Sequence, residues 1–227
     1  MEIMLREELS KIYKKVPEGQ CIGCAICCHE SVGASFAEAQ VICKELKNMP
    51  EDKREALVDS LLEYYFDVYQ IRRKCPFLNK ENRCEIYYSR PLNCRIYGHW
   101  NIKDYNDNLK RLDVQNKEIA KILLEEYGYK VKESYLGFSI EYCNSFKGKI
   151  LSQKDRNELY DELIVLDSKM FVSQGIELAY EDKGIVEHIV DKLLSKEKIF
   201  EIKMSGKLSS RMRKRLSNIA KLRIGVI

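Results

Sequence analysis

The sequence lacks the segments that carry proteins into or across a membrane. No stretch approaches the roughly 18 consecutive apolar residues that a membrane-spanning helix needs. The first residues, MEIMLREELSKIYKK, have no apolar core of the kind that a secretory signal contains. We therefore expect a cytoplasmic protein whose thiols are kept reduced.

Motifs for phosphate, dinucleotide and radical chemistry are missing as well. The eleven glycines form neither G-x-G-x-x-G nor G-x-x-x-x-G-K, so neither a dinucleotide site nor a phosphate loop is indicated. The dense cysteine group has gaps of two and two residues, which is not the C-x3-C-x2-C spacing of radical S-adenosylmethionine enzymes. A methyl-donor site without such a signature stays open.

Histidine is scarce, with three residues, whereas cysteine is abundant, with nine. Most of the cysteines fall in two groups, the first of them dense and directly followed by His29: Cys21, Cys24, Cys27 and Cys28, then Cys75, Cys84 and Cys94. The odd count and the expected compartment both argue against a disulfide framework. Core cysteines would be spread at helical or strand spacing, which the dense group is not. The pattern therefore indicates a metal site.

Apolar residues recur at helical spacing through most of the remaining chain. Helices are predicted over 2–15, from Ser35 to Leu46, from Pro50 to Lys74, after Pro91, between Trp100 and Gly128, from Ser152 to Met170 and over 185–193. Residues 129–142 are predicted to be extended. Cys43 lies on the apolar stripe of the second helix, behind a capping box of Ser35 and Glu38, and is expected in the core. We expect a mainly α-helical fold, a single domain over 1–202 with an irregular cysteine-rich metal-binding core.

The basic character of the protein is concentrated in its last residues. Residues 203–227 hold eight Lys or Arg and no acid. Their apolar residues recur at helical spacing: Leu208, Met212, Leu216, Ile219 and Leu222. This basic amphipathic C-terminal helix either docks its apolar stripe on the domain or contacts an anionic surface such as a membrane, a nucleic acid or an acidic partner.

Three blocks of the sequence resemble a known family. They read C-x2-C-x2-C-C, then CPFL, then C-x-I-Y-x2-R-P-x2-C-R-x-Y. The chain resembles the YkgJ-like cysteine-cluster family, a zinc- or iron-chelating domain, and the cluster region of flagellin lysine N-methylases. The matching residues are Cys21, Cys24, Cys27 and Cys28, then Cys75 to Leu78, then Cys84, Ile86, Tyr87, Arg90, Pro91, Cys94, Arg95 and Tyr97. Cys143, ahead of Gly148, resembles a later cysteine of several members, so the resemblance covers residues 20–148 and implies metal binding by eight cysteines.

The ligands that the sequence offers limit the choice of metal. Thiolate-rich sites select zinc or iron–sulfur clusters, since soft sulfur donors suit both. The spacing C-x2-C-x2-C, followed by a remote Cys-Pro, is an arrangement found in bacterial ferredoxins. A 4Fe-4S cluster is therefore the first expectation, with these ligands: Cys21, Cys24 and Cys27, and one of Cys75, Cys84 or Cys94.

Zinc is the alternative metal. It would be held by four thiolates, or by three thiolates and an imidazole from His29 or His99. Adjacent Cys27 and Cys28 point in different directions in a helix or an extended chain, so one centre is not expected to take both. The sequence thus leaves open two centres, or one centre and a free thiol.

Positive charge accompanies the later cysteines. From Arg72 to Arg95 there are seven cations and two acids. A centre with four thiolates carries a net charge of about −2, which guanidinium groups can offset through hydrogen bonds to sulfur. Arg90 and Arg95 flank the cysteines within the resemblance and are expected to contact the cofactor.

Two classes of function remain open at the level of sequence. The first is a metal-binding protein whose cluster serves a redox or structural purpose, with a redox partner. The second is a protein lysine methyltransferase that uses S-adenosylmethionine, in which the cluster is structural and the substrate is another protein. The family resemblance implies either class.

Overall fold

The computed structural model describes residues 2–29, 32–71, 73–174, 183–194, 196–206 and 208–225. These residues form ten α-helices, two short 3-10 helices and one small antiparallel sheet, which confirms the mainly α-helical fold. The helices are α1 Glu2–Tyr13, α2 Phe36–Lys47, α3 Glu51–Asp67, α4 Leu92–Ile96, α5 Ile102–Tyr127, α6 Glu133–Leu136, α7 Gln153–Gln174, α8 Ile185–Leu193, α9 Lys196–Ser205 and α10 Ser210–Ile224. The remaining elements are β1 Gly19–Gln20, η1 Ile26–Cys28, η2 Tyr97–His99 and β2 Lys147–Gly148. In the part of the chain that the structure describes, no helix is long and apolar enough to cross a membrane.

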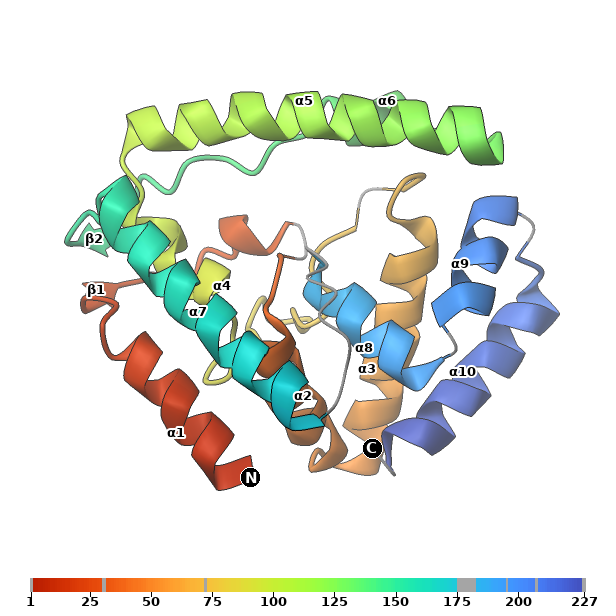
Figure 1. Ribbon diagram of the computed structural model, residues 1–227. Coiled ribbons are helices and arrows are strands. Elements are labelled where there is room, and N and C mark those ends of the chain that lie inside the picture. Colours follow the sequence, from red (N-terminus) through yellow and green to blue (C-terminus); the bar gives the residue numbers. More distant parts are fainter. Residues whose placement is uncertain are drawn as a thin grey trace.

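The helices surround the cysteine-bearing loops. Figure 1 shows α1 and α7 on one side, α3, α8, α9 and α10 on the other, and α5 lying across the top. The helix α2 joins the two sides because its opposite faces enter different cores. Ile42 and Leu46 pack with α3, α8 and α10, whereas Ala37 and Val41 pack with α1, α4 and α7. Cys43 is 3% exposed in the first of these cores, as predicted.

Several helix ends are where the sequence places them. Ser35 and Glu38 form the predicted capping box at the start of α2, which satisfies amide groups that the first turn leaves free. Ser152 and Asp155 exchange hydrogen bonds at the start of α7. Gly128 ends α5 with a φ of 62°, a backbone conformation that favours glycine.

The helix α3 ends earlier than predicted, at Asp67 rather than at Arg72–Lys74. After Asp67 the chain turns, because the amides of Gln70 and Ile71 both donate to the Asp67 carbonyl at 2.8 Å. The Asp67 carboxylate binds Arg73 and, from α10, Arg213. Beyond the end of α3, Ile71 is 51% exposed. Arg72 itself lies outside the described residues.

Residues 129–142 are not continuously extended as predicted, since the single-turn helix α6 interrupts them. The amide of Lys132 donates to the Tyr69 carbonyl at 3.1 Å, and this contact fixes the start of the turn. Tyr129 and Val131 are buried in a small third core with Leu123 of α5. Tertiary packing of these apolar residues therefore decides the path of the segment.

The C-terminal residues form two helices. Gly206, with a φ of 61°, separates α9 from α10. The helix α10 packs on α3 and α8, with Ala220 and Ile224 buried. Leu208, Leu216 and Ile219 of the predicted apolar stripe pack against the main core, whereas Leu222 is 76% exposed. Docking of α10 on the domain is thus the arrangement observed, and contact with an anionic surface stays a prediction.

Candidate metal centre

The first cysteine block is an irregular loop that backbone contacts hold in place. It follows β1 and includes two residues with positive φ, Gly23 at 70° and Ala25 at 59°. The short helix η1 then turns Cys27 and Cys28 back toward the protein, where their Sγ atoms lie 3.9 Å apart. The amide of Cys75 donates to the Cys28 carbonyl at 2.8 Å. This bond ties the first cysteine block to the second.

The second cysteine block, from Cys75 to Cys84, is a turn that hydrogen bonds and a buried side chain hold in place. Leu78 and Cys84 form an isolated antiparallel bridge, as the two extended pieces predicted from sequence require. The Asn79 side-chain oxygen accepts the amides of Glu81 and Arg83 at 3.1 and 2.9 Å, which closes the turn between the two thiols. Phe77, next to Pro76, is 1% exposed and anchors the turn in the core. Burial of an aromatic ring of this size stabilises the fold by about 2 kcal/mol.

The third block is the five-residue helix α4. Pro91, predicted in the first turn, occupies the N-cap, and the Cys94 amide donates to the Pro91 carbonyl at 3.0 Å. Leu92 and Ile96 are both almost completely buried and fix the face that α4 presents to the core. Cys94 lies between them in sequence and points to another face, toward the other thiols.

Four thiols influence one another electrostatically, and we call Cys27, Cys75, Cys84 and Cys94 the inner thiol group. Burial raises the pKa of Cys75 to about 12 and that of Cys94 well above its ordinary value. Burial also raises the pKa of Cys84. The pKa of Cys27 is raised first by the adjacent Cys28 thiol and then by burial. These thiols therefore remain protonated at neutral pH unless a metal cation binds them.

Arg90 supplies positive charge to this group. Its guanidinium lies over the Tyr87 ring at 4.0 Å and lowers the pKa of three of the inner thiols, all except Cys75. The Arg90 Nε is buried and has no hydrogen-bond partner among the described residues. A buried donor without a partner is costly, by about 1–3 kcal/mol. A sulfur anion next to it would remove that cost.

Arg95 makes a different set of contacts. Its Nε donates to the Arg90 carbonyl at 3.0 Å, and its Nη2 donates to the Tyr88 carbonyl. Its guanidinium lies over the Tyr13 ring of α1 at 4.0 Å. These contacts brace the segment between Cys84 and Cys94. Direct contact of Arg95 with a cofactor stays a prediction.

Three further thiols form a second set, the outer thiol group, which consists of Cys21, Cys24 and Cys143. Cys21 and Cys24 are exposed and Cys143 is half-buried. Pairing of β1 with β2 joins the chain before Cys21 to the chain after Cys143, with Gln20 opposite Lys147. The pKa of Tyr97 is raised by burial, by Tyr105, and then by thiols of both groups, namely Cys27, Cys143 and Cys24.

The outer group is held by features that the sequence reading missed. Phe146 packs so closely against three glycines that a Cβ at Gly19, Gly98 or Gly148 would fall 2.1, 2.4 or 2.6 Å from its ring. The same ring contacts buried His99, whose Nδ1 lies 2.6 Å from the Lys149 carbonyl. A glycine in a sequence usually indicates a turn. The close contact of these three glycines with Phe146 could therefore have been predicted only from their spacing around that aromatic residue.

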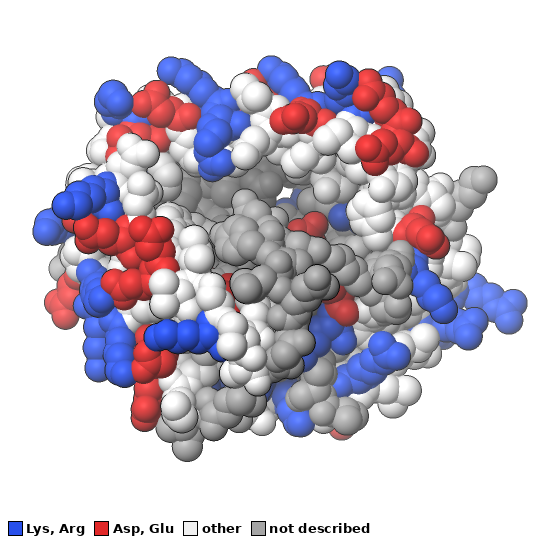
Figure 2. Space-filling view, in the orientation of Figure 1, with Lys and Arg blue, Asp and Glu red and all other residues white. Residues whose placement is uncertain are grey.

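A cleft of about 1700 Å³ has Tyr97 in its lining. It lies between α5 and the helices α2, α7 and α8, and Phe36, Trp100, Leu109 and Phe138 contribute to its lining. Only Leu123 of α5 is buried, so most of the apolar residues predicted on one face of this helix remain accessible. Figure 2 shows charges of both signs along the edge where α5 lies.

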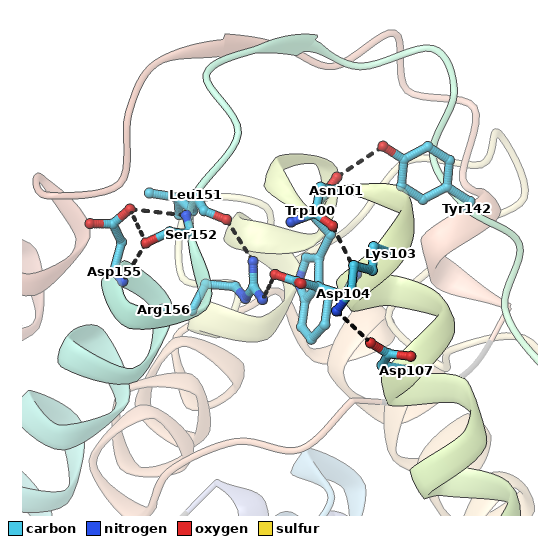
Figure 3. Close-up of polar contacts among 10 residues, drawn as sticks. All are labelled: Trp100, Asn101, Lys103, Asp104, Asp107, Tyr142, Leu151, Ser152, Asp155 and Arg156. Carbon is cyan, nitrogen blue, oxygen red and sulfur yellow. Dashed lines mark hydrogen bonds and ion pairs between the residues drawn. The ribbon is translucent and has the colours of Figure 1, made fainter.

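One wall of the cleft is an ion pair stacked on an aromatic ring. Figure 3 shows Arg156 of α7 beside Asp104 of α5 and the Trp100 ring. The Arg156 Nη2 donates to Asp104 at 2.5 Å, Nη1 donates to the Leu151 carbonyl at 2.6 Å, and the guanidinium lies 4.1 Å from the ring centre. Arg156 is 3% exposed, so these partners are needed to keep its charge buried.

The thiols are of the chemical type that zinc and iron–sulfur clusters bind, but their arrangement does not surround a single metal position. Among the described residues, no group of three or more Cys, His, Asp or Glu has an arrangement that could hold a metal ion. Buried neutral thiols have no mutual attraction to bring them closer. Thiols are the kind of ligand that zinc and iron–sulfur centres use, and the unpartnered Arg90 Nε is a donor of the kind that bonds to metal-bound sulfur.

A comparison with family models gives a match. Residues 20–121 match the family described as "CxxCxxCC: Putative zinc- or iron-chelating domain". Over these residues the chain is similar to that cysteine-cluster domain. The match includes the whole inner thiol group and ends before Cys143, so a ligand role for Cys143 stays a prediction. No curated protein and no solved structure matches the chain.

Proposed function

We propose that the protein holds an iron–sulfur cluster, a 4Fe-4S centre, through the inner thiol group of Cys27, Cys75, Cys84 and Cys94. The observation that carries the proposal is that thiols from three separate segments are close enough to affect one another electrostatically, with the buried, unpartnered Arg90 Nε in the same region. Zinc is the alternative metal, since the family description covers both metals. Such a centre would supply either electron transfer or a structural crosslink of the loops.

The residues of the chain have separate tasks in this proposal. The inner thiols lose their protons as the metal binds, because a metal cation favours thiolate over thiol. Arg90 donates from Nε to sulfur and offsets part of the negative charge of the thiolates. Phe77 and Leu92 keep two of the ligand-bearing segments anchored in the core. The outer thiol group would serve as a second set of ligands or as free thiols.

Metal analysis of protein purified without oxygen tests this proposal. We expect iron and sulfide in comparable amounts, with broad absorption near roughly 400 nm from thiolate-to-iron charge transfer. Stoichiometric zinc without this absorption would establish the alternative metal. Protein that binds neither metal, even after anaerobic reconstitution, would contradict metal binding altogether. Removal of the metal should also lower the melting temperature, because the site cannot exist in the unfolded chain.

A second candidate is a protein lysine methyltransferase in which the cluster is structural. It rests on the resemblance to the cluster region of flagellin lysine N-methylases and on the cleft beside Tyr97, which is large enough for a cofactor and a side chain. Incubation with labelled S-adenosylmethionine and candidate protein substrates tests it. Transfer of label to lysine would support this candidate. If equilibrium dialysis detects no S-adenosylmethionine binding, it is excluded.

A further inference from the structure

Glu38 is a buried carboxylate where three parts of the chain meet, and it is 2% exposed. Its Oε1 accepts the Tyr13 hydroxyl of α1 at 2.8 Å and the Leu92 amide of α4 at 2.6 Å. Its Oε2 accepts the Ser35 amide at 2.9 Å within the capping box of α2. The capping box explains only the last of these bonds. The other two reach residues distant in sequence.

The hydrogen bond between Glu38 and the Leu92 amide supplies α4 with an acceptor at its N-terminus. The helix has five residues, and Pro91 at its N-cap has no side-chain acceptor for the free amides of the first turn. Glu38 therefore caps α4 from another helix, at the residue two positions before Cys94. A carboxylate at a helix N-terminus is also favoured by the helix dipole.

Through its hydrogen bond with Tyr13, Glu38 also supports the segment that precedes α4. The Tyr13 ring lies under the Arg95 guanidinium, and Arg95 donates to the backbone at Tyr88 and Arg90. Glu38 and Tyr13 thus brace both the start of α4 and the loop that leads from Cys84 to it. Two of the inner thiols are attached to these braced segments.

We propose that Glu38 is a positioning residue for the metal centre: its carboxylate fixes the start of α4 and so directs Cys94 toward the other inner thiols. This inference rests on the proposed function, in which Cys94 is a ligand. Glu38 does not contact the metal itself. Its effect passes through the Leu92 amide and the Tyr13 hydroxyl.

The chain offers a matched control in Asp167 of α7. It is also a buried carboxylate, 4% exposed, and it also accepts amides at the start of α2, those of Phe36 and Ala37, both at 2.8 Å. Its bonds end at α2 and do not reach α4. Glu38→Gln and Asp167→Asn therefore both weaken the start of α2, whereas only Glu38→Gln disturbs the start of α4.

The first experiment measures metal affinity in the full chain by competition between each protein and a colorimetric chelator for zinc. Loss of a group that orients a metal ligand typically lowers affinity 10- to 100-fold, so we expect about 10-fold for Glu38→Gln. Asp167→Asn should remain within about threefold of the unmodified protein, because it leaves the ligands in place. Equal losses in the two variants would overturn the proposal.

The second experiment does not depend on the metal. In metal-free protein, alkylation followed by peptide mass spectrometry gives the rate at Cys94 relative to that at Cys75. Glu38→Gln should raise this ratio several-fold, and Asp167→Asn should leave it unchanged. An unchanged ratio in Glu38→Gln overturns the positioning role even if the unmodified protein binds no metal, a result that would contradict the proposed function separately.

A milder variant covers the case in which Glu38→Gln does not fold. Tyr13→Phe removes one donor to Glu38 and keeps the ring under Arg95 and the bond to Leu92. It should shift zinc affinity and the Cys94 to Cys75 ratio in the same direction as Glu38→Gln, by a smaller factor. If Tyr13→Phe matches the unmodified protein in both measurements, Glu38 has no positioning role through this contact.

Discussion

The inner and outer thiol groups both draw on the dense cysteine stretch that begins at Cys21, but they have different surroundings. The inner thiols come from three segments anchored by buried residues such as Phe77 and Leu92, and burial or close neighbours raise their pKa. The outer thiols lie on exposed or half-buried chain held by a two-residue sheet pairing and by Phe146. Cysteine spacing alone therefore does not divide a cluster into centres; the packing of the flanking residues does.

The largest expected difference is in metal content. Cys94→Ala should abolish metal binding, because it removes a ligand of the inner group and leaves an incomplete site. Cys143→Ala should retain most of the metal, and Cys43→Ala, which removes a buried core thiol that belongs to neither group, should retain all of it. The measurement is metal per protein after anaerobic purification. Loss of metal in Cys143→Ala and not in Cys94→Ala would reverse the assignment of the two groups.

Thiol reactivity should separate the groups next. With its pKa at about 12 rather than at the ordinary 9.0, Cys75 holds about three orders of magnitude less thiolate at neutral pH. Exposed Cys21 and Cys24 should therefore react with a maleimide at least about 100-fold faster than Cys75 in metal-free protein. Peptide mapping at timed intervals measures the rates. Denatured protein is the control, in which all should react alike; equal rates in folded protein would refute the difference in burial.

Arg90 should affect the inner group alone. Arg90→Gln removes the buried donor next to the thiols and should lower metal affinity about 10-fold. Arg83→Gln is the matched control, because it removes the same charge from an exposed position in the same region. Chelator competition compares the two variants. If they weaken binding equally, the general positive charge of the region matters and the specific contact of Arg90 does not.

The glycine contacts of Phe146 test how the outer group is held. Gly98→Ala would place a Cβ 2.4 Å from the Phe146 ring and should lower the free energy of unfolding by about 1–3 kcal/mol. Gly137→Ala is the control, since its Cβ would meet only the Glu133 carbonyl at 3.6 Å. Urea denaturation measures both. A Gly98→Ala protein as stable as Gly137→Ala would show that the ring can move aside at little cost.

Lys203 tests the effect of burial on a charged group away from the thiols. It is 4% exposed between the Tyr65 and Tyr69 rings, and burial lowers its pKa from 10.5 to about 8. Below pH 8 the lysine is charged in both states, and the folded state bears the cost of burying that charge. Between pH 8 and 10.5 the unfolded state binds more protons, so stability rises with pH.

The comparison with Lys203→Met isolates this contribution. From pH 7 to pH 10, the stability of the unmodified protein relative to Lys203→Met should rise by roughly 1–2 kcal/mol, less than the pKa shift alone implies because the two rings favour the charged form. Other groups titrate in this range but are common to both proteins. Urea denaturation with reductant present measures the difference. A pH-independent difference would mean that Lys203 keeps its ordinary pKa.

Local sequence signals predicted most of the helix ends correctly. The capping boxes at Ser35 and Ser152, Pro91 at the start of α4 and Gly128 after α5 depend on contacts within a few residues, so their effects can be read from the chain. The end of α3 was predicted too late for the opposite reason. The ion pair of Asp67 with Arg213 joins residues that are remote in sequence.

The sequence by itself determined that this protein is mainly helical and carries a thiolate donor set for a metal, because helical periodicity and cysteine spacing are local patterns. Only the tertiary structure decided which thiols share surroundings, since Cys27, Cys75, Cys84 and Cys94 are brought together by the packing of separate segments. It also decided that Glu38 caps α4 as well as α2. The sequence indicates the local hydrogen-bond partner of a carboxylate in a capping box. A partner 54 residues away depends on how the helices pack.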